Sequence, residues 1–435
     1  MPSALRNSLN KLRILLPFCF VAAAQGNTTP IYKFDFGPGK VAAGYKQVLA
    51  ENIYSRQTGY GFEPGSAVQC FDRSGPDLLG KDFCTSDRPF YFSVALPEGN
   101  YLVRVVFGDY ENSTLTTVKA ELRRLMLERV ETAAGKFVSQ TFAVNVRTPE
   151  IGGVEVRLKD REKTLEAWAW DEKLTLEFNN VHPVVNAIEI TRVDRLPTIY
   201  LLGDSTVCDQ PSEPYASWGQ MLTRFFKPEV VIANNAESGE SLRSSLASLR
   251  LYKVINSIKP GDFLLIQYGH NDEKEKGDGV GAFTTYKADL KKFVGAARQK
   301  RATPILITPV QRRTFDQEGR ITNSHGDYPE AVRQVAREEN VALIDLHLMS
   351  THFYEALGPE RSKLAFKDGD GTHHNNYGSY ELAKCIVEGI RTAKLDLVRY
   401  LVDDFKGFDP SRPDSAEAFH LPPSPAVTNS KPLGS

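Results

Sequence analysis

This sequence of 435 residues has no excess of either charge, since 53 Lys and Arg residues stand against 54 Asp and Glu residues. Nucleic-acid-binding proteins usually carry a strong basic excess, so this balance argues against a nucleic-acid partner. Cysteine is scarce, with five residues, and their spacing fits no zinc-binding template, so no metal is expected. After the N-terminal region, no apolar run approaches the roughly 20 residues that span a bilayer. The length fits two globular domains.

The N-terminal region has the features of an export signal. Arg6, Lys11 and Arg13 precede an apolar stretch at 14–24 that ends in three alanines. A positive segment, a short apolar segment and small residues in this order are typical of a cleaved secretory signal. We therefore predict that residues 1–24 are a signal peptide and that the protein is secreted or periplasmic.

An oxidising compartment would permit disulfides. Without Cys19 of the predicted signal, four cysteines remain: Cys70, Cys84, Cys208 and Cys385. Four cysteines allow three pairings, and the sequence does not choose among them. The two that lie closest in sequence, Cys70 and Cys84, are the first candidates for a bridge, and buried free thiols are the alternative.

Residues 30–193 are predicted to form an all-β sandwich. The stretches 91–96 and 101–107 alternate apolar with polar residues around the turn at 97–100, which is typical of a hairpin. The stretches 174–178 and 186–193 alternate in the same way, as expected for strands with one buried and one solvated face.

Residues 197–400 are predicted to form a three-layer α/β/α domain with a parallel sheet. Strand-like runs alternate there with helical patterns, which indicates parallel strands joined by crossover helices. The expected strands are 198–202, 230–233, 263–268, 304–308 and 341–345, and the expected helices are 218–226, 242–256, 285–300, 329–339 and 379–392. Residues 409–435 are rich in Pro, Ser and Ala, which predicts a poorly ordered tail.

In such a domain, active sites form beyond the carboxyl ends of the strands. Ser205 follows the first strand, in a tight turn after Gly203, and is a candidate nucleophile. On its own the turn is better explained as a helix cap. Gly239 follows the second strand and Asn271 the third, and both could donate a hydrogen bond to a developing oxyanion.

Asp370 precedes His373 by three residues on a glycine-containing loop. A carboxylate at this spacing can hold the far nitrogen of the imidazole while the near nitrogen takes a proton from serine. A helix-capping aspartate beside a solvated histidine is the alternative for this pair alone. The ordered set, taken together, predicts a serine hydrolase.

The segments 203–206, 269–272 and 370–373, with Gly239, resemble the conserved blocks of the SGNH (GDSL-type) hydrolase superfamily. Within it, the likeness is to the rhamnogalacturonan acetylesterases of carbohydrate esterase family 12, which the stretch 307–329 also resembles. The resemblance implies that Ser205 is the nucleophile, His373 the general base and Asp370 the group that orients the base. It also implies an oxyanion hole formed by the backbone N–H groups of Ser205 and Gly239 and the side chain of Asn271. No metal or organic cofactor is implied.

The implied substrate is an acetylated, galacturonate-containing pectic polysaccharide, which is anionic. Arg243, Arg312 and Arg313 lie in loops expected at the crevice and could pair with uronate carboxylates, with ordinary surface charge as the alternative. We also assign His325 and His374 to the substrate site. His374 is a rival base, but the spacing from Asp370 favours His373, which leaves His374 as a wall of the site.

The β-rich region is similar to the galactose-binding-like jelly-roll modules that accompany such esterases, through Tyr32–Gly37 and Val105–Asp109. Whether this region binds sugar stays open. Two other functions are compatible with the sequence. One is a serine esterase or lipase that acts on other acetylated glycans, small esters or lipid esters, and the other is a non-catalytic carbohydrate-binding protein.

Overall fold

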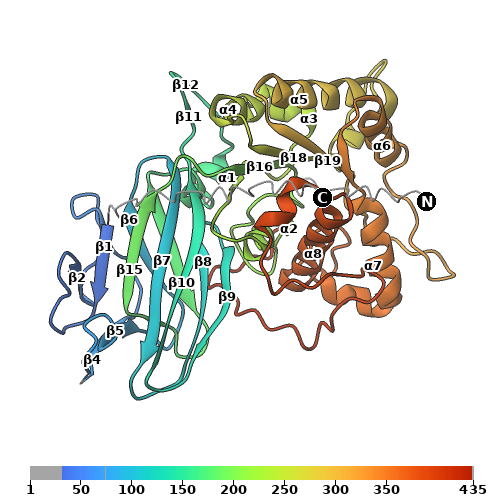
Figure 1. Cartoon of the computed structure of the whole chain (residues 1–435). Coiled ribbons are helices and arrows are strands. Elements are labelled where there is room, and N and C mark those ends of the chain that lie inside the picture. The colour runs from blue at the N-terminus through green and yellow to red at the C-terminus, as the bar shows by residue number, and fades with distance from the viewer. Residues whose placement is uncertain (1–31, 74, 434–435) are drawn as a thin grey trace, which may run out of the picture.

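The computed structural model describes residues 32–73 and 75–433, and the predicted signal peptide lies outside these residues. An all-β sandwich forms the first half of the described chain, and a three-layer α/β/α domain follows it (Figure 1). Both predicted fold classes are therefore confirmed. None of the helices in the described ranges combines the length and hydropathy required to cross a membrane.

The sandwich consists of two five-stranded sheets. One has the order β10 (Lys136–Val146), β7 (Gly99–Asp109), β15 (Ala187–Arg192), β1 (Tyr32–Phe36) and β2 (Lys46–Val48). The other has the order β3 (Tyr60–Phe62), β6 (Phe90–Ala95), β13 (Lys173–Asn179), β8 (Thr114–Ala120) and β9 (Arg124–Thr132). Smaller pairings join β14 (Val184–Val185), β5 (Asp82–Thr85) and β4 (Gln69–Asp72), and also β11 (Glu150–Ile151) with β12 (Val154–Glu155).

Aromatic side chains fill the space between the two sheets. Phe92 packs edge-on against both Phe34 and Phe36, with ring centroids 5.3 and 4.9 Å apart. Edge-to-face pairs of this kind stabilise a core beyond the effect of area burial. The alternation in the sequence reflects this packing, because every second side chain of a strand points inward.

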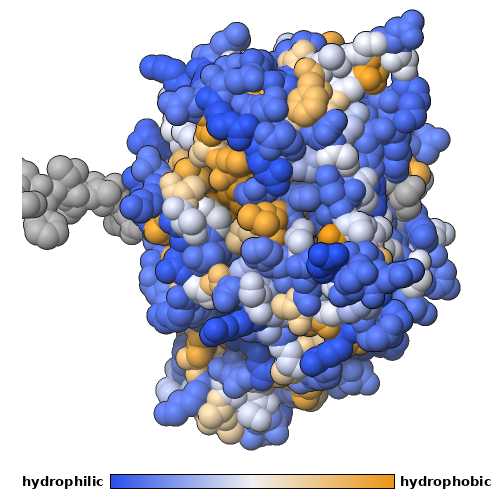
Figure 2. Space-filling model, turned by 90° about the vertical axis from the view of Figure 1, so that its right-hand side faces the viewer, coloured by the Kyte–Doolittle hydropathy of each residue, from blue (hydrophilic) through white to orange (hydrophobic). Residues whose placement is uncertain are grey.

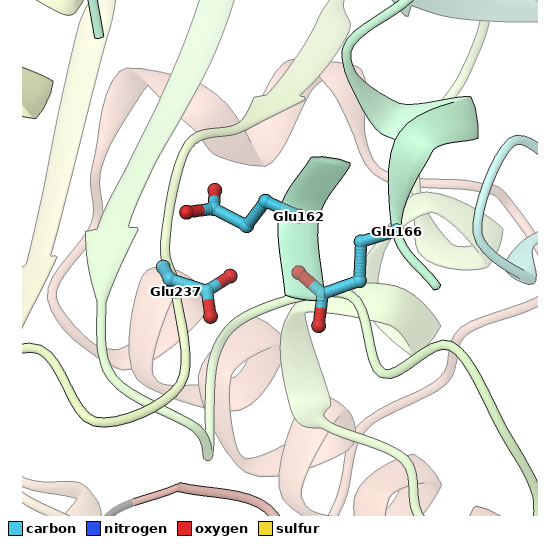
Figure 3. Close-up of side chains that lie close together, drawn as sticks. All are labelled: Glu162, Glu166 and Glu237. Atoms are coloured by element: carbon cyan, nitrogen blue, oxygen red, sulfur yellow. The ribbon is translucent and has the colours of Figure 1, made fainter. Parts of the chain in front are cut away.

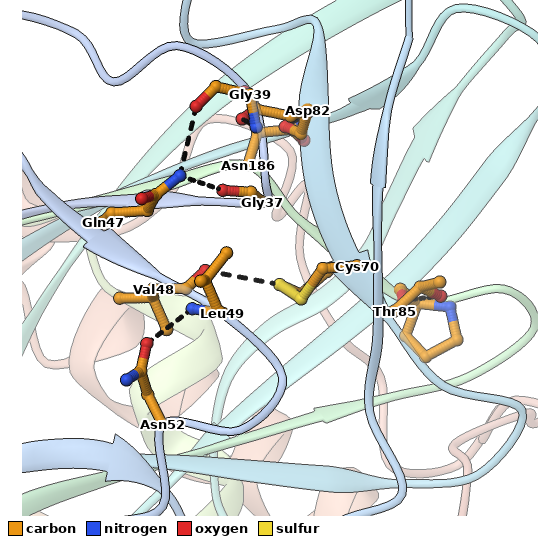
Figure 4. The surroundings of a disulfide bond; sticks show 12 residues. Gly37, Gly39, Gln47, Val48, Leu49, Asn52, Cys70, Asp82, Thr85 and Asn186 are labelled. Atoms are coloured by element: carbon orange, nitrogen blue, oxygen red, sulfur yellow. Dashed lines mark hydrogen bonds between the residues drawn. A yellow bond between two sulfur atoms is a disulfide. The ribbon is translucent and has the colours of Figure 1, made fainter.

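A disulfide joins Cys70 on β4 to Cys84 on β5, the pair that the sequence analysis gave as the first candidate (Figure 4). The two residues are direct partners in the antiparallel register of these strands. The other two cysteines, Cys208 and Cys385, are free and buried. The bridge therefore belongs to the sandwich, and the α/β domain has no disulfide among its described residues.

The second domain is built on a five-stranded parallel sheet with the order β17 (Val231–Asn234), β16 (Thr198–Gly203), β18 (Phe263–Gln267), β19 (Thr303–Ile307) and β20 (Ala342–Ile344). Its strands are buried on both faces and read as continuous apolar runs. The order changes direction at β16, whose two neighbours are β17 and β18. In open sheets, a crevice forms beside such a change of direction, at the carboxyl ends of the strands.

Helices cover both faces of this sheet (Figure 1). One layer contains α3 (Leu242–Ala247), α4 (Arg250–Ser257), α5 (Lys287–Gln299) and α6 (Tyr328–Glu338), and the other contains α2 (Trp218–Leu222), α7 (Leu346–Arg361) and α8 (Asn376–Thr392). Short helical turns lie at Ala167–Ala169, Thr223–Phe225, Asp272–Lys274, Ala282–Tyr286, Ser362–Ala365 and Asp396–Tyr400. A further short helix, α1 (Asp160–Lys163), belongs to the sandwich half of the chain.

The turn between β8 and β9 docks the sandwich onto α2. Arg124, whose side chain is 1% exposed, has its Nε 3.2 Å from Asp209 Oδ2. Gln220 donates to the carbonyl of Leu122 at 2.7 Å, and Thr223 donates to that of Leu125 at 2.7 Å. These buried polar contacts fix how the two domains meet, since each group would be costly to leave unpaired.

The structure differs from the predicted poorly ordered tail. Residues 422–433, which we call the strap, lie against both domains. Lys119 Nζ of the sandwich donates to the carbonyl of Pro422 at 2.7 Å, and Glu213 of the α/β domain accepts from the backbone N–H groups of Ser424 and Thr428 at 3.0 and 2.8 Å. A proline-rich composition gives no sign of such partners, because they come from distant segments.

Hydrophilic residues cover most of the face drawn in Figure 2, and the apolar residues on it form small patches among them. The most exposed large apolar side chains, Leu165, Val181 and Val427, come from separate segments. Apolar side chains scattered in this way are normal for a globular protein surface.

Candidate active site

Three predicted residues form a chain of contacts at the carboxyl end of the sheet. Ser205 follows β16, and its Oγ lies 2.9 Å from Nε2 of His373. The other ring nitrogen of His373, Nδ1, lies 3.1 Å from Oδ2 of Asp370. The serine and the histidine are 168 residues apart in sequence and come into contact only in the folded chain.

Local chemistry shapes the loop that carries the histidine. Asp370 Oδ1 accepts hydrogen bonds from the backbone N–H groups of Thr372 and His373 at 2.8 and 3.1 Å, which tightens the turn before α8. Burial alone would raise the pKa of Asp370, but its hydrogen bond and charge interaction with His373 outweigh burial and hold that pKa below its usual range. The carboxylate therefore stays ionised and favours the tautomer of His373 in which Nε2 can accept the serine proton.

The loop of the predicted donor Gly239 is linked to the Ser205 turn, because Gln210 Nε2 donates to the carbonyl of Ser205 and to Ser238 Oγ at 2.8 and 3.2 Å. Gly239 has φ of +77°, a conformation that side chains other than glycine rarely adopt. Among the described residues, neither the Ser205 nor the Gly239 backbone N–H has a hydrogen-bond partner. Asn271 Nδ2 donates to the carbonyl of Glu240 at 3.0 Å, which ties the loop after β18 to the loop after β17. Two free backbone N–H groups beside a hydroxyl are what an oxyanion requires.

The sequence analysis missed His270, whose side chain contacts Asp204 in the turn that carries Ser205. Its Nδ1 lies 3.2 Å from Oδ2 of Asp204, and both side chains are fully buried. Asp204 Oδ1 also accepts from the backbone N–H of Thr206 at 2.9 Å. Burial lowers the pKa of His270 to about 4, so the ring is neutral near neutral pH. The only signal in the sequence is its position directly before Asn271.

His374 does not compete with His373 as a base. Its Nε2 is 2.6 Å from the hydroxyl of Tyr354, and its ring centroid is 4.3 Å from that of Phe366. Burial, followed by the charge of His373, lowers the pKa of His374 to about 3. The ring is therefore neutral and packs between Tyr354 and Phe366, and its role as a wall of the substrate site stays a prediction.

The predicted substrate-binding residues are not equally accessible. His325 is buried, with Nδ1 2.7 Å from Glu273 and Nε2 2.9 Å from the carbonyl of Val310, so this structure offers neither nitrogen to a ligand. Arg312 pairs with the same Glu273 at 2.5 Å. In this structure the ring holds the carboxylate that pairs with Arg312, and a contact of His325 with substrate stays a prediction.

The other two arginines lie nearer the surface. Arg313 donates to Ser362 Oγ at 2.9 Å, and its backbone N–H donates to the carbonyl of Gly371 in the histidine loop at 2.8 Å. The side chain of Arg243 is 49% exposed and has a long ion pair of 3.4 Å with Glu275. Of the three predicted arginines, Arg243 therefore has the least engaged guanidinium.

The strap reaches the edge of this site. A Cβ placed on Gly239 would lie 3.0 Å from Cβ of Leu433, and Pro432 is buried. Strap residues 428–433 and Tyr215 help to line a cavity of about 380 Å³. The Tyr215 ring meets the ring of His373 edge-on, with centroids 6.0 Å apart. With the strap in place, Ser205 is only 1% exposed.

Models of known protein families match parts of both domains. The model of the GDSL-like lipase/acylhydrolase family matches residues 201–379, and a model described as beta-agarase/YXIM esterase-like, galactose-binding domain-like, matches residues 32–147. Rhamnogalacturonan acetylesterase RhgT of Bacillus subtilis (strain 168) is 40% identical over 219 residues, which make up 47% of this chain and 94% of that protein.

Two further relatives come from the same organism. The probable rhamnogalacturonan acetylesterase YesY is 37% identical over 213 residues, or 47% of this chain and 98% of that protein. The uncharacterized esterase YxiM is 29% identical over 391 residues and extends across both domains, with 87% of this chain and 96% of that protein covered.

Fold and site together define a hydrolase of the SGNH type. The chain belongs to the GDSL-like lipase/acylhydrolase family and is a serine esterase.

Proposed function

We propose that this esterase removes acetyl groups from rhamnogalacturonan through a Ser205–His373–Asp370 triad. The contact chain from Ser205 Oγ to His373 Nε2 and from His373 Nδ1 to Asp370 carries the mechanistic part of this proposal. The names of RhgT and YesY, with 40% and 37% identity across nearly their whole lengths, support the substrate.

In the first step, Ser205 Oγ attacks the acetyl carbonyl carbon while its proton moves to Nε2 of His373. The negative charge that develops on the carbonyl oxygen is stabilised by the N–H groups of Ser205 and Gly239 and by the amide of Asn271. One such donor contributes about 3–4 kcal/mol to transition-state stabilisation in comparable sites. The bond to the sugar oxygen then breaks, and that oxygen takes the proton from His373.

The second step regenerates the enzyme. Water attacks the acetyl group on Ser205 and gives a proton to His373, and the returning proton restores the serine hydroxyl as acetate leaves. Asp370 stabilises the imidazolium that forms in each step. The residues of this chain supply the nucleophile, the base and the oxyanion donors.

The anionic backbone of the substrate requires positive charge at the crevice. Arg243 is the best-placed candidate among the three predicted arginines, because its exposed guanidinium has the weakest internal pairing. Guanidinium and carboxylate groups match in a two-pronged geometry. We propose that Arg243 binds a galacturonate carboxylate, while Arg312 and Arg313 shape the neighbouring loops. The predicted export signal fits a polysaccharide substrate outside the cell.

Acetate release tests the function. Purified protein would be incubated with acetylated rhamnogalacturonan, acetylated xylan, an aryl acetate and a long-chain aryl ester, with Ser205→Ala as the inactive control. We expect the highest rate on rhamnogalacturonan and no release by the variant. Equal rates on both glycans would refute the pectin substrate, and preference for the long-chain ester would indicate a lipase. Binding of glycan without any hydrolysis would indicate a non-catalytic protein.

A further inference from the structure

Three glutamates meet in the protein interior directly behind the loop that carries Gly239 (Figure 3). Glu162 lies in α1 and Glu166 a few residues beyond it, whereas Glu237 lies in the loop after β17. One carboxylate oxygen of each residue lies within 4.8 Å of those of the other two, and all three side chains are buried. The carboxyl groups of Glu166 and Glu237 face each other in Figure 3.

Basic residues neutralise two of these glutamates. Arg250 NH2 is 2.6 Å from Glu162, and Arg161 NH2 is 2.5 Å from Glu166. Glu237 has no comparable partner, because Arg161 Nε, the nearer cationic group, is 3.9 Å from its Oε1. That oxygen is buried and accepts no hydrogen bond from any described residue.

The surrounding groups leave one negative charge in excess. A fourth buried glutamate, Glu240, lies 2.8 Å from Lys159 and 3.6 Å from Arg250. The cluster thus holds four carboxylates against the three cations Lys159, Arg161 and Arg250. The buried Arg147 also acts on Glu162, but it interacts more strongly with Asp209 and Glu121 outside the cluster. The thiol of Cys208 also faces Glu237, and burial raises its pKa, which keeps it neutral.

A single proton balances this excess better than a metal ion. A divalent cation would leave the cluster with a net positive charge. It would also lie close to the positively charged guanidinium of Arg161 and be repelled by it. Burial, together with the charges of Glu166 and Glu162, raises the pKa of Glu237 well above its ordinary value. A hydrogen bond between the carboxyl groups of Glu237 and Glu166 then requires no further cation.

The segment Lys159–Glu166 of the sandwich half contacts the residues on both sides of Gly239 in the sequence. Lys159 Nζ donates to the backbone carbonyl of Ser238 and pairs with the side chain of Glu240. Glu237 lies two residues before Gly239, and its carboxyl group lies close to those of Glu162 in α1 and Glu166 just beyond it. The loop residues before and after the oxyanion donor are therefore fixed by one short segment, Lys159–Glu166.

We propose that the segment Lys159–Glu166 positions the oxyanion loop of the α/β domain and that Glu237 acts in this contact as a neutral carboxylic acid. The inference rests on the proposed oxyanion role of Gly239. In this proposal the sandwich half contributes to catalysis by positioning the oxyanion loop, without binding sugar. Glu237 and Lys159 are positioning residues, since neither faces the reacting atoms.

The pH profile of the wild type and of Glu237→Gln provides the first test. A neutral Glu237 must lose its proton as the pH rises through its raised pKa, and the uncompensated charge then repels Glu166 and disturbs the loop. We expect kcat of the wild type to decline on the alkaline side with little change in KM. Glu237→Gln cannot ionise, so its profile should lack this decline. Identical profiles would overturn the proposal.

Lys159→Gln provides the second test, and this side chain is partly exposed, so the variant should fold. We expect kcat to fall about tenfold or more with KM changed less than twofold, because a displaced donor weakens only transition-state binding. Wild-type kcat would refute a positioning role. The exposed Glu155→Gln on β12 is the matched control and should behave as the wild type.

Two measurements separate the possible failures. Acetate release by the wild type must be present, because its absence would refute the proposed function rather than the positioning role. Elemental analysis of the purified wild type should detect no stoichiometric metal that is lost in Glu237→Gln. A metal bound in that way would overturn the neutral-acid assignment and identify the cluster as a cation site.

Discussion

Replacing Asp370 with asparagine tests the triad most directly. The substitution keeps the size of the side chain but removes the charge that faces His373 across 3.1 Å. At an effective dielectric constant of about 20, a carboxylate and an imidazolium at this distance attract each other by about 5 kcal/mol. That attraction is present only when His373 is protonated, in the transition state, so its loss lowers the rate rather than substrate binding.

This energy corresponds to a loss of about four orders of magnitude in kcat, since about 1.4 kcal/mol changes a rate tenfold. An asparagine can also donate to Nδ1 and thereby favour the tautomer that leaves no lone pair on Nε2 for the serine proton. The expected result is a large fall in kcat for aryl acetate hydrolysis with KM changed little, and circular dichroism should show the wild-type fold.

Asp368→Asn is the matched control, because Asp368 lies in the same loop and its side chain is exposed. Its kcat should equal that of the wild type. A loss of less than tenfold in Asp370→Asn, in a folded protein, would refute the role that we give to this carboxylate.

Three further predictions follow from other parts of the molecule. Deletion of residues 428–435 should speed the labelling of Ser205 by a small fluorophosphonate, because the strap reaches Gly239 at the edge of the site, and an unchanged rate would refute this role of the strap. Reduction of the Cys70–Cys84 bridge, whose cysteines are 14 residues apart, should lower the free energy of unfolding by about 3 kcal/mol, and the reductant should have no further effect on the Cys70→Ala/Cys84→Ala double variant in the same denaturation assay. The pKa of Asp370 is lower in the folded state than in the unfolded state, so its stabilising contribution is fully present above pH about 4 and is lost as the pH falls through the folded-state pKa. Asp370→Asn should therefore reduce the loss of stability below pH about 4. The same dependence of stability on acid pH in the variant and the wild type would contradict this prediction.

Much of the α/β domain could be predicted from local patterns. The predicted strand at 198–202 corresponds to β16, and the remaining four strands agree within one or two residues. The predicted helix at 242–256 is divided in the structure, because Leu249 adopts a left-handed conformation between α3 and α4. Helix α7 was missed, since its apolar spacing is irregular and Gly358 interrupts it with a non-helical conformation.

Residue type and order were enough to select the serine, histidine and aspartate. The carboxyl ends of neighbouring parallel strands must share one edge of the sheet, so Ser205, Gly239 and Asn271 had to come close whatever the details of packing. A short separation within one domain made Cys70 and Cys84 the first candidates for a disulfide, but only the structure chose this pairing over the alternatives.

The tertiary structure decided what distant segments bring to this edge. Nothing near Leu433 in sequence indicates that the strap meets Gly239, and nothing near Glu162 indicates that it approaches Glu237. Local periodicity reports which face of a strand or helix is buried, because it reflects the geometry of the backbone. It cannot report the partner that covers that face or the charges that meet there, since these depend on contacts between residues far apart in the chain.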